Sequence, residues 1–213
     1  MNIASYIDHT LLKPDATSKM IEKLCSEAIE YDFYSVCVNP MWVPFASELL
    51  TNEKPLVCSV VGFPLGATPL AATEAKWAVA SGAGEIDMVL PVGLLKQGDE
   101  DSVFQAISSV VSVVPGIPVK VILETYLLTD EEKVKACKIS VNAGAAFVKT
   151  STGFAGGGAT IEDVTLMRKT VGSAPGVKAS GGVRSYQCAI DMIKAGASRI
   201  GTSSGISIVN GSK

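Results

Sequence analysis

The sequence predicts an α/β fold, a (β/α)8 TIM barrel that forms a single domain over residues 1–213. Short β-branched runs alternate with longer amphipathic stretches from one end of the chain to the other. Strict alternation of this kind demands a parallel sheet with right-handed crossovers. Eight such units close most simply as a barrel, and the 213 residues exceed the lower size bound of about 200 for that fold.

An open, doubly wound sheet is the competing architecture for the same alternation. That fold often carries a G-x-G-x-x-G turn after its first strand, where a dinucleotide binds. No such turn follows the first predicted strand here. The sequence therefore favours the closed barrel.

Eight runs have the length and the β-branched or aromatic content of buried strands. They lie at residues 6–10, 34–38, 56–61, 85–90, 119–124, 147–151, 176–180 and 199–203. Four stretches between them carry clear helix signals, at residues 16–33, 68–84, 129–145 and 160–172. The N-cap candidates are Thr17 or Ser18 in the first, Thr129 or Asp130 in the third, and Thr160 in the fourth.

Composition excludes several classes of protein. A formal net charge of −3 gives no reason to expect nucleic acid or an anionic membrane as a partner. The five cysteines are scattered and form no C-x-x-C, which favours a reducing cytoplasm over a disulfide framework. The first ten residues lack the pattern of a signal peptide, and no apolar run approaches the ~20 residues of a membrane helix. We expect a cytoplasmic protein.

Two lysines stand in strands that otherwise look buried. Lys149 in "FVKTST" and Lys178 in "GVKASGG" are about one strand-plus-helix unit apart, and each leads through a serine to glycines. If both point into the barrel, two ammonium groups share a poorly hydrated cavity, and one should lose its proton near neutral pH. A neutral lysine amine forms Schiff bases with carbonyl compounds. Asp87 in "EIDMV" could then move protons together with the charged lysine.

A structural interpretation of the same residues stays open at this point. A single lysine in a predicted strand is usually exposed or on an edge, and we expect this of Lys120. A single aspartate in an apolar strand can be a buried hydrogen-bond partner. The recurrence of the lysine, serine and glycine pattern weakens this alternative without removing it.

Glycines and serines after the last two predicted strands indicate a phosphate site. In TIM barrels the loops after strands 7 and 8 often hold phosphate through backbone N–H groups. The candidates are Gly181, Gly182, Gly201, Ser203 and Ser204, with Arg184 as a possible helper. The run "GFAGGGAT" lacks the Gly-Lys-Ser/Thr end of a P-loop, so it can simply be a tight loop.

The residues around the lone histidine predict no metal site. His9 and scattered cysteines do not supply the ligands of a zinc centre, and we expect His9 to make a hydrogen bond at the end of the first strand. Asp8 and Thr10 beside it are candidates for the pocket wall. Cys37 is expected to be a small buried residue rather than a pocket thiol.

The motifs together resemble the deoxyribose-phosphate aldolase family. They are "YIDHTLLKPDAT", "VCVNP", "VVGFPLG", "GAGEIDMVLPVG", "VKVILET", "FVKTSTGF", "VKASGGVR" and "RIGTSSG", and they span essentially the whole chain. The resemblance implies a class I aldolase that needs neither metal nor cofactor. It would cleave 2-deoxy-D-ribose 5-phosphate reversibly to acetaldehyde and D-glyceraldehyde 3-phosphate.

The resemblance also implies a role for individual residues. Lys149 would form the Schiff base, Lys178 would perturb it and take part in proton transfer, and Asp87 would be the acid/base partner. The glycines and serines of the two late loops would bind the phosphate, with Thr150 and Gly153 also at the substrate.

Two positions depart from the family pattern. Some members carry a phosphate-binding lysine where this chain has Phe154, and some end in a tyrosine that this chain lacks. Two other functions remain open: another imine-forming barrel of the transaldolase type, and a non-catalytic barrel that binds sugar phosphates. The sequence leaves a homo-oligomer open.

Overall fold

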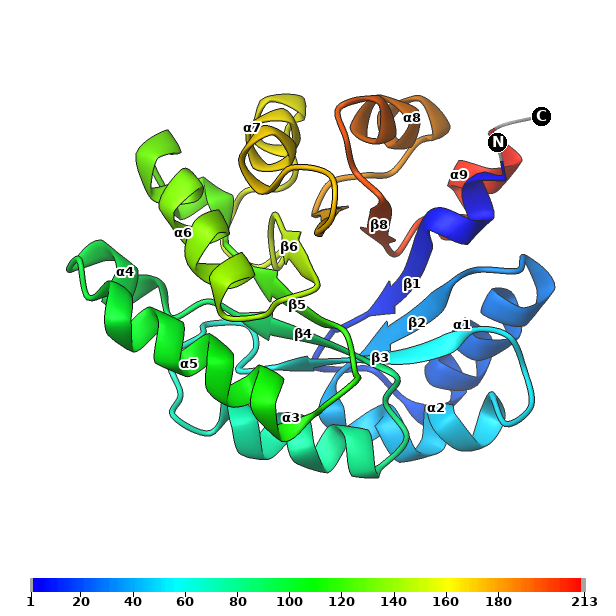
Figure 1. The fold of residues 1–213 in the computed structure, drawn as a ribbon. Coiled ribbons are helices and arrows are strands. Elements are labelled where there is room, and N and C mark those ends of the chain that lie inside the picture. Colours follow the sequence, from blue (N-terminus) through cyan, green and yellow to red (C-terminus); the bar gives the residue numbers. More distant parts are fainter. Residues whose placement is uncertain (1, 212–213) are drawn as a thin grey trace.

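The predicted barrel is present in the computed structural model, which describes residues 2–211. Eight parallel strands pair in sequence order, and β8 closes on β1. The helices surround this ring (Figure 1). The strands are β1 Ile7–Leu11, β2 Ser35–Val38, β3 Leu56–Val61, β4 Glu85–Val89, β5 Val119–Ile122, β6 Phe147–Lys149, β7 Gly176–Ser180 and β8 Arg199–Thr202. Each predicted strand is confirmed within two residues at either end.

The helices follow the strands as the alternation predicts. They are η1 Ile3–Tyr6, α1 Ser18–Glu30, η2 Pro40–Trp42, α2 Val43–Leu49, α3 Ala71–Ala80, α4 Val92–Lys96, α5 Glu100–Val113, η3 Thr125–Leu127, α6 Asp130–Asn142, α7 Ile161–Val171, α8 Tyr186–Lys194 and α9 Gly205–Asn210. Thr17, Thr129 and Thr160 occupy N-cap positions. Thr129 forms a full capping box with Glu132, whereas Thr17 makes no side-chain cap bond.

Side-chain alternation along the strands separates two environments. Residues such as Ile7, Val36 and Val148 belong to the large apolar cluster that also includes residues of the surrounding helices. The alternate residues carry charge or sulfur, and only a small apolar cluster around Cys37, Cys58 and Val60 occurs among them. The barrel is therefore apolar towards its helices and largely polar inside.

Within residues 2–211, no helix is long and apolar enough to cross a membrane. The last two residues of the C-terminal segment that lacks the family tyrosine lie outside this described range.

The capping box of α6 gives a test of the local fold. Thr129 Oγ1 accepts from the backbone N–H of Glu132 (3.3 Å), and Glu132 Oε2 accepts from the N–H of Thr129 (2.8 Å). Thr129→Ala should lower the free energy of unfolding by about 1 kcal/mol, measured by urea denaturation. Ser108→Ala, which changes an exposed hydroxyl within α5, is the control and should cause no comparable loss.

Candidate active site

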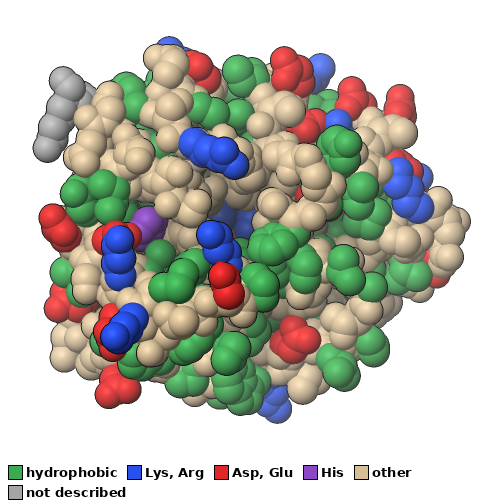
Figure 2. All heavy atoms as spheres, turned by 180° about the vertical axis from the view of Figure 1, so that it is seen from behind, with side chains coloured by type: hydrophobic (Ala, Val, Ile, Leu, Met, Phe, Trp, Pro, Cys, Tyr) green, Lys and Arg blue, Asp and Glu red, His purple; other side chains and the backbone are tan. Residues whose placement is uncertain are grey.

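A cavity of about 330 Å³ opens at the C-terminal ends of the strands, where TIM barrels carry their active sites. The face seen in Figure 2 is hollowed near its middle, where Lys and Arg side chains (blue) gather. The cavity is lined by loops after β1, β6, β7 and β8. Its residues are Thr10, Leu11, Leu12, Lys13, Lys149, Thr152, Gly153, Phe154, Ser180, Gly181, Gly182, Val183, Arg184, Gly201, Thr202 and Ser203.

Lys149 and Lys178 meet at the floor of this cavity. They are register partners on β6 and β7, so their side chains leave the sheet on the same face. Both ammonium nitrogens contact the same oxygen, Asp87 Oδ2, at 2.8 Å and 2.7 Å. The side chain of Lys149 is 3% exposed and lines the cavity, whereas Lys178 is fully buried beneath it. The predicted convergence of the two lysines and Asp87 is confirmed.

Asp87 is the centre of a buried ion cluster. Its other oxygen, Oδ1, accepts a hydrogen bond from Lys120 (2.8 Å), the residue opposite it on β5. Burial alone would raise the pKa of Asp87, but Lys120, Lys149 and Lys178 outweigh this and hold it well below its usual range. Asp87 is therefore a carboxylate at neutral pH.

A second layer of charges lies deeper in the barrel. Lys120 also contacts Glu85 (2.8 Å), and Lys178 also contacts Asp8 (2.5 Å). Arg199 contacts both of those carboxylates, Asp8 at 2.9 Å and Glu85 at 3.1 Å. Four cationic side chains and three carboxylates thus form one continuous network from the cavity floor inwards.

The network fixes the protonation of its inner members. Burial alone would lower the pKa of Lys178, but Asp8 and Asp87 raise it well above the ordinary lysine value. Burial would raise the pKa of Asp8, yet Lys178, Lys120 and Arg199 together lower it to about 2. Lys178 is therefore an ammonium at neutral pH, and it lies beside Lys149.

The prediction that Lys120 is exposed is wrong. Its side chain is fully buried, with Glu85 and Asp87 as partners. The sequence argument weighed the lysine by itself, and a lone lysine belongs at the surface. Two carboxylates on the neighbouring strand β4 supply the compensation that burial of an ammonium requires.

Glycines at the ends of β7 and β8 line the cavity. Gly181 and Gly182 have φ values of 87° and 79°, a region that favours glycine, and both line the cavity. Gly201 also lines it, and a Cβ there would lie 2.9 Å from Cε of Lys178. Gly201 therefore leaves the space that Lys178 occupies.

Ser203 and Ser204 differ in position. Ser203 lines the cavity. Ser204 does not, and its backbone N–H donates to Thr202 Oγ1 (2.9 Å). Arg184 lines the cavity as an exposed side chain. The structure thus brings five of the six predicted phosphate residues together.

The glycine run after β6 serves mainly to pack one loop on another. Gly158 lies against the backbone of Gly181, so that a Cβ would come within 2.4 Å of its carbonyl oxygen. Gly157 lies equally close to the ring of Tyr126. Of this run, only Gly153 and Phe154 line the cavity. The interpretation as a tight loop that leads to the cap of α7 is supported.

The remaining candidates lie mostly below or beside the cavity. Thr10 lines it, whereas Asp8 lies deeper as a partner of Lys178 and Arg199. Thr150 Oγ1 donates to the carbonyl of Ser180 (2.9 Å) and joins the ends of β6 and β7. The hydrogen bond predicted for His9 is confirmed, since its Nε2 lies 2.6 Å from a carboxylate oxygen of Glu27.

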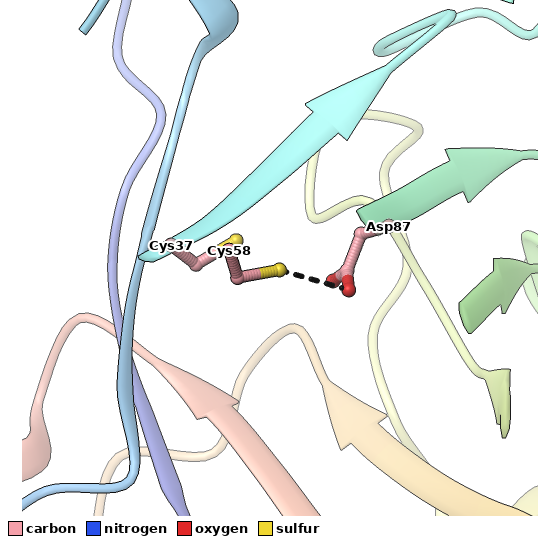
Figure 3. A group of neighbouring side chains, drawn as sticks. All are labelled: Cys37, Cys58 and Asp87. Carbon is pink, nitrogen blue, oxygen red and sulfur yellow. Dashed lines mark hydrogen bonds between the residues drawn. The ribbon is translucent and has the colours of Figure 1, made fainter. Parts of the chain in front are cut away.

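Cys37, Cys58 and Asp87 form a buried group with metal-ligand chemistry. One atom from each lies within 4.8 Å of the others, and Cys58 donates a hydrogen bond to Asp87 (3.1 Å; Figure 3). A hydrogen bond from Cys58 lowers the pKa of Cys37, as expected for neighbouring thiols that share a proton. Three ammonium groups already contact Asp87, and their charge opposes a further cation there.

Sequence reasoning missed several residues of the site. Glu85 and Arg199 stand in predicted strands, and the signal for both was their charge. Glu85 lies on the same face of its strand as Asp87, and Arg199 is the register partner of Lys178 on the neighbouring strand. The sequence places Glu124 at the end of the fifth predicted strand as a polar group but does not reveal its partner. At φ 57°, Glu124 accepts hydrogen bonds from the N–H and hydroxyl of Thr152, which lines the cavity. Lys13 lines the cavity from the loop after β1.

A cavity at the C-terminal ends of the strands, with a charged cluster at its floor, is typical of a TIM-barrel enzyme. Comparison with known proteins narrows the class. The chain belongs to the DeoC/LacD family of aldolases, whose model matches residues 2–211, and it is accordingly a lyase.

Individual relatives cover nearly the full chain. A deoxyribose-phosphate aldolase of Brevibacillus brevis is 62% identical over 100% of this chain and 97% of its own length. One from Carboxydothermus hydrogenoformans is 60% identical over 98% and 94%. The tetrameric deoxyribose phosphate aldolase of Aeropyrum pernix superposes with a TM-score of 0.91 at 37% identity, covering 98% of this chain and 89% of that one.

The buried position of Lys120 gives a direct test of the ion cluster. Lys120→Met should lower the free energy of unfolding by about 3–5 kcal/mol, because it strips Glu85 and Asp87 of a buried partner. Chemical denaturation measures the loss. Lys138→Met, which removes an exposed lysine of α6, should stay within about 0.5 kcal/mol of the parent. Equal effects of the two changes would contradict the buried cluster.

Proposed function

We propose that this chain is a deoxyribose-phosphate aldolase of class I, which cleaves 2-deoxy-D-ribose 5-phosphate reversibly to acetaldehyde and D-glyceraldehyde 3-phosphate. The observation that carries the proposal is the position of Lys149, a cavity-lining amine in contact with Asp87 and next to the charged Lys178. The names of relatives at about 60% identity support the substrate.

The balance of charge supports Lys149 as the nucleophile. Lys120 and Lys178 each contact two carboxylates, whereas Asp87 is the one carboxylate that contacts Lys149 within residues 2–211. The network has one cation more than it has carboxylates, so it becomes neutral when one lysine gives up its proton. Of the three lysines, Lys149 has the fewest carboxylate partners, and it faces the cavity. The free amine of a lysine is the form that attacks a carbonyl.

The covalent steps follow from an amine at the cavity floor. The nitrogen of Lys149 adds to C1 of the open-chain sugar, and loss of water from the carbinolamine gives an iminium. Removal of the proton on the C3 hydroxyl breaks the C2–C3 bond, and the electron pair moves into the iminium to form an enamine. Glyceraldehyde 3-phosphate leaves. Protonation of the enamine and addition of water release acetaldehyde and restore the amine.

Lys178 and Asp87 are suited to the proton transfers, acting through a water molecule. Lys178 remains an ammonium and can donate, while Asp87 remains a carboxylate that orients both lysines. Neither side chain lines the cavity, which is why a water must connect them to the substrate. The reaction so described draws on no metal or organic cofactor.

The phosphate end of the substrate is proposed to bind at the loops after β7 and β8. Gly181 and Gly182 line the cavity in the loop after β7, Gly201 lines it from the end of β8, and Ser203 adds a hydroxyl. Arg184 contributes charge. Ser204 would act only through its side chain, because its N–H is already bonded. Phosphate held at the rim positions C1 above the amine at the floor.

We also propose that the enzyme works in the cytoplasm and assembles from copies of the same chain. Five free thiols support a reducing compartment. The tetramer described for the Aeropyrum pernix enzyme supports assembly.

Reductive trapping tests the nucleophile. Incubation with deoxyribose 5-phosphate and borohydride should fix an acetaldehyde-derived adduct on Lys149, because reduction of the imine makes the bond permanent. Peptide mass spectrometry locates the adduct, and a ketose phosphate in place of the substrate separates a transaldolase-like activity. An adduct that survives Lys149→Ala would contradict the assignment.

The pH dependence of the rate tests the role of Lys178. Lys178→Leu removes one positive charge from the buried cluster, so it should move the rising limb of the pH–rate profile to higher pH and depress the rate at pH 7. Steady-state assays from pH 5 to 10 measure the shift. The control is Lys138→Leu, and a Lys178→Leu profile of unchanged shape would count against the role.

A further inference from the structure

The cavity lining carries positive charge and, among the residues that line it, no carboxylate. Its cations are Lys13, Lys149 and Arg184. Lys149 is almost completely buried at the floor, whereas Lys13 and Arg184 are exposed at the rim. The rim therefore attracts an anion, and its two cations come from different loops.

The barrel order places these two cations on either side of the loop after β8. Strand β8 pairs with β7 on one side and with β1 on the other. Arg184 follows β7, and Lys13 follows β1. Between them lie Gly201 and Ser203, which line the same cavity. An anion bound at the loop after β8 would thus lie between two positive side chains.

Phe154 leaves the opposite side of the phosphate loops without a cation. It follows β6 and packs edge-on against Phe63, with ring centroids 5.2 Å apart. A phenyl ring offers no ammonium to a phosphate. Lys13 is the cavity-lining lysine that the proposed chemistry does not use.

The backbone of Lys13 is held firmly, although its side chain is exposed. Leu12 before it is buried, and its carbonyl accepts a hydrogen bond from Asn39 (3.1 Å). The carbonyl of Lys13 itself accepts from the N–H of Ala16 (3.2 Å), across a turn that contains Pro14. Within residues 2–211, the ammonium of Lys13 has no carboxylate or hydrogen-bond partner. The backbone of Lys13 is therefore fixed, and its ammonium group is free to bind an anion.

We propose that Lys13 binds the phosphate group of the substrate and closes the phosphate site from the β1 side. The inference rests on the proposed function, since it assumes a phosphate ester as substrate, and it adds the residue that makes the site selective for phosphorylated sugars. Lys13 is a binding residue and takes no part in bond cleavage.

Two substrates that differ only in the phosphate test the inference. Lys13→Met should raise KM for 2-deoxyribose 5-phosphate about ten-fold or more, the effect of losing a hydrogen bond between charged groups. The variant should leave kcat within about two-fold and kcat/KM for unphosphorylated 2-deoxyribose unchanged. Lys13→Arg should retain most of the affinity. An equal fall for both sugars, no change for either, or a loss in Lys13→Arg as large as in Lys13→Met would overturn the inference.

Binding of inorganic phosphate separates this inference from the proposed reaction. Calorimetric titration should show phosphate binding about ten-fold or more weaker in Lys13→Met than in the parent, whatever sugar the enzyme cleaves. Lys138→Met, which removes the same charge from outside the cavity, should bind phosphate like the parent. Equal phosphate binding by all three proteins would overturn the role of Lys13. A parent that binds phosphate but cleaves neither sugar would instead contradict only the proposed function.

Discussion

The structure of the site depends on one carboxylate that binds three lysines. Asp87 receives Lys120 on one oxygen and both Lys149 and Lys178 on the other. Each ammonium would be costly to bury by itself, and their mutual repulsion would drive them apart. A shared carboxylate at 2.7–2.8 Å is what allows them to converge. The distance between Lys149 and Lys178 is therefore set by Asp87.

This constraint propagates through the barrel interior. Lys120 and Lys178 need further carboxylates, which Glu85 and Asp8 supply, and these in turn need Arg199. TIM barrels commonly fill this space with layers of branched apolar side chains. Replacing buried ion networks by apolar side chains is often neutral or stabilising, so stability alone does not account for the network. Its consequence is chemical, because it fixes which lysine is held by one carboxylate only.

The fold and the convergence of Lys149 with Lys178 could be predicted from the sequence, because both rest on local patterns. Strand positions follow from β-branched runs, and the N-cap at Thr160 follows from its spacing to Asp163. The fate of Lys120 could not be predicted in this way. Its burial depends on Asp87 and Glu85, which lie on another strand more than 30 residues earlier and only become neighbours through the barrel register. The role of Gly158 likewise depends on the approach of the loop that contains Gly181.

Charge is divided between two depths of the cavity, and this division determines how a substrate can lie. At the floor, Lys149 contacts Asp87 and its side chain faces the cavity. At the rim, Lys13 and Arg184 have no carboxylate partner within residues 2–211 and favour an anion. Phe154, which follows β6, packs on Phe63 and makes that side of the rim apolar. A sugar with an aldehyde at one end and a phosphate at the other satisfies both depths in only one orientation. The reversed orientation would move the phosphate away from Lys13 and Arg184 and leave these rim cations without a partner.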